Sequence, residues 1–138
     1  MAETLYTVRA HIKGVDLAPR KVSIVADLVR GRSVADALVI LEHTQRRSAR
    51  PIAKAIASAQ SNAINNHGLD AKSLVISTLS VSAGPRLKRF KPHMRGMALP
   101  FQKKTSHILV EVSGAEKPKK KPAAPKAEKP AAAKKEEK

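Results

Sequence analysis

The feature that most restricts the fold of this chain is a long basic stretch, Gly84–Lys104, which contains seven basic residues and no acidic one. Three prolines and Gly96 within the stretch oppose a helix. The flanking segments, Leu74–Val81 and His107–Val112, alternate apolar and polar side chains as strands do. We therefore expect the two flanks to be arms of one long β-hairpin, about residues 82–107, that projects beyond the core of so small a domain. A two-stranded ribbon is only marginally stable in water, so we expect it to be ordered where a partner encloses it.

The charge of the chain indicates that this partner is a polyanion. Lys and Arg number 27 against 11 Asp and Glu, which gives a formal net charge of +16. Residues 115–138 carry nine Lys and four Glu, so +5 lies there and +11 lies on residues 1–114. The rest of the chain is therefore basic by itself, as expected of a protein that binds nucleic acid. Only three aromatic residues are present, Tyr6, Phe90 and Phe101, which disfavours a module that reads single-stranded bases on several stacking platforms.

The composition also indicates a domain boundary and the compartment in which the protein is found. Residues 115–138 contain only Lys, Ala, Pro and Glu, so this segment has little to bury and is expected to be a disordered C-terminal tail. The absence of Cys excludes disulfide scaffolds and fits a reducing compartment. No signal-peptide pattern is evident, and the longest stretch without a charged residue, Ala55–Leu69, is too polar to span a membrane. We expect a soluble, cytoplasmic protein without a membrane partner.

Hydrophobic periodicity predicts a strand and three helices before the hairpin. The strand covers residues 6–12, where apolar and polar residues alternate. The first helix runs from Pro19 to the Arg30-Gly31 pair, and the second is capped by Ser33. The third covers about 48–66 and is stopped near Gly68. The first helix is expected to bury four residues on one stripe: Val22, Val25, Leu28 and Val29.

Basic residues outside the hairpin are candidate phosphate contacts. Arg20 and Lys21 lie at the start of the first helix, where the helix dipole disfavours cations, so a bound anion explains them better than the dipole does. The same argument applies to the basic residues beside the start of the third helix, Arg46, Arg47 and Arg50.

Other positions leave alternatives open. On the first strand, Arg9 and Lys13 face either RNA or simply water, and the sequence by itself slightly favours water. Phe90 stacks on a base or packs across the hairpin, with equal weight. Gly84 and Gly96 would permit close backbone approach to RNA.

No motif for catalysis or cofactor binding occurs in the sequence. The five His show no metal-ligand spacing, and the chain has no P-loop, nucleophile elbow or dinucleotide-binding glycine pattern. We expect no catalytic residue, metal, cofactor or small-molecule substrate. One rival interpretation is a DNA-compacting protein, suggested by the tail and the Arg-rich hairpin, but the Ala-rich third helix offers only a modest dimer face. Another, an RNA-processing enzyme, would need a metal-binding carboxylate pair, and the seven acids of residues 1–114 are scattered.

Several short motifs follow one another along the chain in a specific order. They are Pro19-Arg20-Lys21, the run Val25–Gly31, Ser58-Ala59 with Asn62-Ala63, Gly84-Pro85 with Lys88-Arg89, then Pro92, Gly96 and Lys104-Thr105-Ser106-His107-Ile108. Each motif is weak alone. Together, from about Tyr6 to Val112, they resemble the family of large ribosomal subunit protein number twenty-two of the bacterial type.

This resemblance implies an α+β fold with a small antiparallel three-stranded sheet, three helices packed on it and a long protruding hairpin. It implies a structural constituent of the large ribosomal subunit that binds large-subunit ribosomal RNA and aids assembly. The hairpin is expected to line the nascent-peptide exit tunnel. The expected partners are the RNA, neighbouring ribosomal proteins and the nascent polypeptide. On this interpretation residues 1–114 form the RNA-binding domain, and the tail over 115–138 lies outside the family's common core.

The resemblance also assigns residues. The candidate ribosomal RNA contacts are Arg9, Lys13, Arg20, Lys21, Arg32, Arg46, Arg47, Arg50, Lys88, Arg89, Lys91, Arg95, Lys103 and Lys104. The tunnel tip, carried over by position, is Arg86, Leu87, Lys88, Arg89, Phe90, Lys91, Pro92, His93, Met94 and Arg95. The chain departs from the family where Ala18 replaces a capping Ser, and where His93 and Met97 replace two guanidinium groups. Pro100 in the returning arm cannot donate a ladder hydrogen bond.

Overall fold

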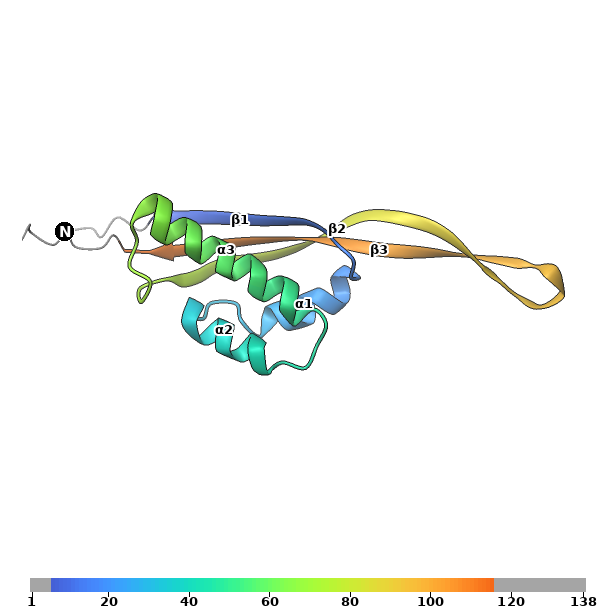
Figure 1. Ribbon diagram of the computed structural model, residues 1–138, viewed down its shortest axis with the longest axis horizontal. Helices are drawn as coiled ribbons and strands as arrows, with labels where there is room; N and C mark the ends of the chain where they lie inside the picture. The colour runs from blue at the N-terminus through green and yellow to red at the C-terminus, as the bar shows by residue number, and fades with distance from the viewer. Residues whose placement is uncertain (1–5, 116–138) are drawn as a thin grey trace, which may run out of the picture.

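The computed structural model describes residues 6–115, which form one three-stranded sheet and three helices (Figure 1). In chain order the elements are β1 (Tyr6–Val15), α1 (Pro19–Asp27), α2 (Val34–His43), α3 (Ala49–His67), β2 (Val75–Pro92), a short 3-10 helix (Met94–Gly96) and β3 (Ala98–Gly114). The expected α+β fold with a long hairpin is therefore confirmed. The expected tail, apart from Ala115, lies outside the described residues.

The third strand, β3, lies in the middle of an antiparallel sheet with the order β1-β3-β2. β1 pairs with β3 only as far as Val15, which lies opposite Ser106. β2 pairs with β3 to its own end, where Pro92 lies opposite Ala98. Because β1 stops first, β2 and β3 continue as a two-stranded ribbon, which Figure 1 shows extending away from the helices.

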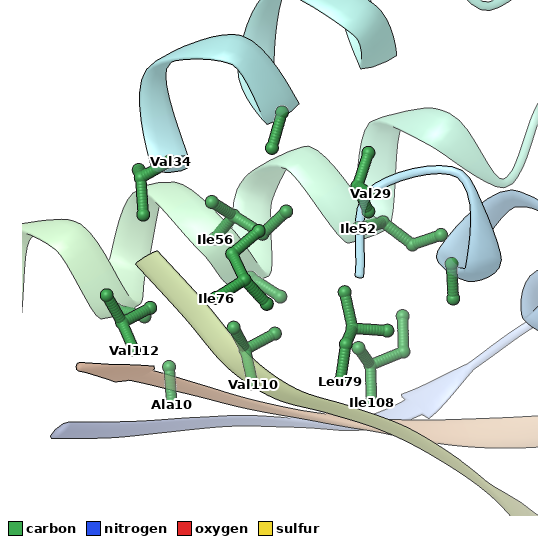
Figure 2. Packing of buried hydrophobic residues seen from close by; sticks show 14 of the residues in the cluster. Ala10, Val29, Val34, Ile52, Ile56, Ile76, Leu79, Ile108, Val110 and Val112 are labelled. Carbon is green, nitrogen blue, oxygen red and sulfur yellow. The ribbon is translucent and has the colours of Figure 1, made fainter. Parts of the chain in front are cut away.

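The helices cover one face of the sheet, and the hydrophobic core lies between the two layers (Figure 2). β3 contributes Ile108, Val110 and Val112, which alternate as the sequence predicts and are fully buried. α3 contributes Ile52 and Ile56, which are also fully buried. Burial of these large aliphatic side chains is the main term that stabilises the domain. The core holds the base of the ribbon, and the ribbon itself lies outside the core.

The first helix is shorter than the sequence predicts. α1 ends at Asp27 rather than at Gly31. The expected burial of Leu28 is wrong, because its side chain is 48% exposed while Val22 and Val29 are fully buried. Leu28 is the C-cap residue just past the end of α1, and the buried stripe of the helix itself consists of Val22, Val25 and Ala26. Apolar character at a spacing of three was therefore not enough to place this residue.

The ends of the helices follow the local sequence. The side-chain oxygen of Ser33 accepts a hydrogen bond from the backbone N–H of Asp36 at 3.1 Å, which confirms the predicted cap of α2. Gly68 ends α3 in the left-handed conformation with φ 62°. Ala18 provides no side-chain cap for α1, as its replacement of Ser implies.

Candidate nucleic-acid interface

The ribbon leaves the domain at a joint where both outer strands bulge against β3. In β1 the pairing register shifts between Ile12 and Val15. In β2 it shifts between Ala83 and Arg86. Both shifts lie beside Ser106 of the central strand. Bulges bend a strand and increase its twist, so this joint sets the direction in which the ribbon projects.

Two hydrogen bonds and one close approach hold the joint together. The backbone N–H of Gly14 donates to Nδ1 of His107 at 2.9 Å. The Oγ1 of Thr105 donates to the carbonyl oxygen of Pro85 at 2.8 Å. A Cβ atom on Gly84 would lie only 2.5 Å from that Oγ1, so the approach of β2 to β3 requires glycine here. The structure therefore gives a reason within the protein for glycine at position 84, in addition to the expected approach to RNA.

Two of the predicted RNA contacts are paired with carboxylates of the chain itself. Nε of Arg9 lies 2.7 Å from Oε1 of Glu111, across the β1–β3 pair. Nζ of Lys103 lies 2.7 Å from Oδ2 of Asp16, next to the joint. Both cations are at least half exposed, and ion pairs at a protein surface stabilise a fold by about 1 kcal/mol or less. Their carboxylates do, however, reduce the charge that either cation offers to a phosphate.

The turn of the hairpin lies at residues 93–97, at the C-terminal end of the predicted tip. The backbone N–H of His93 donates to the carbonyl oxygen of Met97 at 2.7 Å. The chain reverses through two left-handed residues, Arg95 with φ 54° and Gly96 with φ 75°. Residues 86–92 consequently belong to the outgoing strand β2, and only the last three residues of the predicted tip lie in the turn.

The ribbon has no core of its own, because every residue from Pro85 to Lys104 is exposed. Phe90 is 70% exposed, so the opposite arm leaves most of its side chain uncovered. Phe101, by contrast, is 38% exposed, and Nζ of Lys91 lies 5.2 Å from the centre of its ring. The two phenylalanines therefore differ, since one is engaged by a neighbouring cation and the other is presented to solvent.

The loop between α2 and α3 brings together three predicted contacts. Arg46, Arg47 and Arg50 line a cleft of about 730 Å³ between these helices. Arg46 and Arg47 also line a second cleft of about 360 Å³, whose other wall includes Lys21 of α1. Lys21, distant in sequence, thus joins the arginine group, and its neighbour Arg20 is exposed on the same helix. We call Lys21, Arg46, Arg47 and Arg50 the elbow cluster.

The remaining predicted cations lie apart from the elbow cluster. Lys13 is exposed within the β1 bulge at the joint, and Nε of Arg32 donates to a backbone carbonyl just after α1. Sequence analysis also missed a structural role for Arg30, which donates to the carbonyl oxygen of Leu79 at 2.9 Å and pairs with Asp27. The contact with Leu79 joins residues 49 apart in the chain and leaves no local pattern, whereas the pair with Asp27 has the i,i+3 spacing that a sequence does display.

The described residues show neither a cluster of metal ligands nor a helix that could span a membrane. Over residues 6–115, no group of three or more His, Cys, Asp or Glu side chains is placed to hold a metal ion. In the same range, none of the helices combines the length and apolarity needed to cross a membrane.

Comparison with known proteins points to one family. The family model for ribosomal protein L22p/L17e matches residues 10–113, which include the joint and the whole ribbon. The large ribosomal subunit protein uL22 of Pediococcus pentosaceus is 48% identical over 113 residues, which cover 82% of this chain and 96% of that protein. The protein of the same name from Mycoplasmopsis pulmonis is 49% identical over 106 residues, which cover 77% of this chain and 96% of that protein.

Proposed function

Because the chain belongs to the ribosomal protein L22p/L17e family, and is therefore a structural constituent of the large ribosomal subunit and not an enzyme, we propose that it binds large-subunit ribosomal RNA through two basic surfaces. One surface is the ribbon, and the other is the elbow cluster on the helical side of the domain. Binding of both surfaces aids assembly of the subunit, and the turn of the ribbon lines the path of the nascent polypeptide.

The observation that carries this proposal is the ribbon itself. It extends away from the helices, buries none of its side chains and carries seven cations between Gly84 and Lys104 (Figure 1). Such a ribbon is marginal in water, and its like charges repel. Phosphates beside the ribbon would remove the repulsion, and release of their counterions would supply binding free energy. A folded RNA that encloses the ribbon meets both needs.

The elbow cluster supports a second, separate contact. Its arginines have planar guanidinium groups that bind phosphate oxygens through two hydrogen bonds each. Glu42 is the one acidic residue among those that line the larger cleft, and the smaller cleft has none. The cluster lies in and beside the loop between α2 and α3, whereas the ribbon continues the sheet, so the two surfaces suit two separate RNA segments.

The turn supports the proposed contact with the nascent polypeptide. Residues 93–97 form the end of the ribbon farthest from the helices (Figure 1). Met94 and Met97 are exposed there, on either side of the cation Arg95. Methionine side chains are flexible and polarisable, which suits brief contact with polypeptides of varied sequence.

Competition binding tests the RNA part of the proposal. The full chain is titrated onto large-subunit particles that lack it, with duplex DNA as competitor and over a range of salt concentrations. We expect the particles to retain the protein at salt concentrations that remove it from DNA, because shape contacts add to phosphate contacts. Equal loss from both would contradict the proposal and favour a non-specific polyanion binder.

A shortened ribbon tests the tunnel part. In this variant residues 87–103 are replaced by Asn-Gly, a two-residue turn that closes the pair Arg86 and Lys104. We expect the variant to enter the subunit more weakly, and a map of the assembled subunit to show a wider lumen where the turn would lie. A lumen of unchanged width would overturn the proposed contact with the nascent chain.

A further inference from the structure

The pairing register sorts the side chains of the ribbon onto two faces. Residues directly opposite each other in an antiparallel pair project to the same side, and successive residues along a strand project to opposite sides. The first face, which we call the open face, carries Arg86, Lys88, Phe90, Gln102 and Lys104. The second, which we call the paired face, carries Leu87, Arg89, Lys91, Leu99, Phe101 and Lys103. Because the two arms wind about each other (Figure 1), each face follows the ribbon as a strip.

Every cation of the paired face is engaged within the protein. Arg89 donates from Nη1 to the carbonyl oxygen of the preceding residue at 2.9 Å. Lys91 lies over the ring of Phe101 at 5.2 Å from its centre. Lys103 forms its ion pair with Asp16 at 2.7 Å. An RNA phosphate would have to compete with these partners for each of the three charges.

The cations of the open face lack such partners. Within residues 6–115, no carboxylate, ring or carbonyl engages the side chains of Arg86, Lys88 or Lys104. Arg86 lies directly opposite Lys104, and like charges placed directly across a strand pair are unfavourable unless an anion lies near them. On the same face, Phe90 exposes 70% of its surface to solvent, and the cation Lys88 lies two residues before it.

We propose that the open face is the side of the ribbon that contacts RNA, and that the paired face is not a phosphate-binding surface. Arg86, Lys88 and Lys104 bind backbone phosphates, and Phe90 stacks on an unpaired base beside them. Every base offers a flat face, so one exposed phenyl ring needs no particular sequence. The inference rests on the proposed function and deepens it, because it removes Arg89, Lys91 and Lys103 from the predicted phosphate contacts.

Single substitutions on the two faces test the assignment of the cations. The full chain is titrated onto large-subunit particles that lack it, and the logarithm of the affinity is plotted against the logarithm of the salt concentration. Affinity falls as salt rises, and each lost phosphate contact makes this slope shallower by about one. We expect this loss for Lys88→Ala and Lys104→Ala, and an unchanged slope for Lys91→Ala and Arg89→Ala. Equal losses on both faces would overturn the inference. All four residues are exposed, so the core is untouched.

The stacking role of Phe90 has its own matched control on the opposite face. Phe90→Leu keeps an apolar side chain and removes the aromatic ring, and Phe101→Leu makes the same change on the paired face. We expect Phe90→Leu to weaken binding roughly tenfold without changing the salt slope, since stacking on a base is not an ionic contact. Phe101→Leu should weaken it less. Equal effects of the two variants, or none from Phe90→Leu, would contradict the stacking role.

Failure of this inference can be told apart from failure of the proposed function. If the unsubstituted chain binds the particles no better than it binds duplex DNA, the proposed function itself fails. If the chain prefers the particles and the variants of the two faces behave alike, the proposed function stands and the assignment of RNA contacts to the open face alone is wrong.

Discussion

Replacement of Gly84 by Ala tests whether direct contact between β2 and β3 closes the joint. The added Cβ atom would lie 2.5 Å from Oγ1 of Thr105 and 3.2 Å from the backbone carbonyl carbon of the same residue. The nearer contact is impossible, so the hydroxyl must rotate away. Rotation breaks its 2.8 Å hydrogen bond to the carbonyl oxygen of Pro85. The backbone contact can relax only if the two strands separate by a few tenths of an ångström.

These contacts set the size of the expected effect. The lost hydrogen bond costs about 1 kcal/mol of the free energy of unfolding. Overpacking against a backbone atom adds about 1–3 kcal/mol. We therefore expect Gly84→Ala to destabilise the full chain by roughly 2–4 kcal/mol, a large fraction of the total stability of a domain this size. Ser82→Ala, at an exposed position of the same strand, is the control and should change stability by less than about 0.5 kcal/mol.

A double-mutant cycle in urea, followed by far-ultraviolet circular dichroism, separates this mechanism from a general loss of stability. Thr105→Ala removes the hydroxyl and should cost about 1 kcal/mol alone. In the double variant the added methyl group of residue 84 no longer meets that oxygen, so the total cost should be smaller than the sum of the single costs by about 1–2 kcal/mol. Additive costs would refute the reasoning, because they would show that Thr105 is not what excludes a side chain at Gly84.

Three further predictions address the core, a helix end and the elbow cluster. Ile56→Ala, at a fully buried position, should lower the free energy of unfolding by about 2–5 kcal/mol in the same titration. The control Val39→Ala, at an exposed position, should lower it by less than about 0.5 kcal/mol, and similar values for the two variants would show that the packing is misassigned. Ala18→Ser should raise stability by about 1 kcal/mol, because it supplies the missing cap of α1, and the absence of a gain would show that the hydroxyl does not reach the helix N–H groups. Substitution of both Arg46 and Arg47 by Ala should lower the salt slope of particle binding by about two, and an unchanged slope would remove the elbow from the RNA contacts.

Local patterns were sufficient for the elements and the core of this fold. Alternation identified the buried side of β3, since Ile108 and Val110 are fully buried. The cap at Ser33 and the stop at Gly68 are short-range features, which the sequence displays directly. Leu28 shows where such patterns fail, because a residue at the margin of an apolar stripe is buried or exposed according to what the neighbouring element covers.

The geometry of the ribbon could not be obtained in this way. Its turn depends on a left-handed Arg95 beside Gly96, and arginine carries no propensity for that conformation. The ion pair between Lys103 and Asp16 joins residues that are far apart in the chain, and it exists only because two bulges align the strands. The pattern of charges predicted a cationic hairpin, but only the register shows which cations share a face.

The joint and the open face are connected through the cost of placing like charges together. The first pair of the ribbon beyond the joint is Arg86 with Lys104, two cations whose repulsion opposes pairing of the strands. The contacts that offset this repulsion lie directly next to it: the hydrogen bond from Thr105 to Pro85 and the ion pair of Lys103 with Asp16. Each of these contributes about 1 kcal/mol or less, which is not enough to give the ribbon a stability of its own. A phosphate between Arg86 and Lys104 would turn their repulsion into attraction to a shared anion, so RNA binding and ordering of the ribbon should occur together.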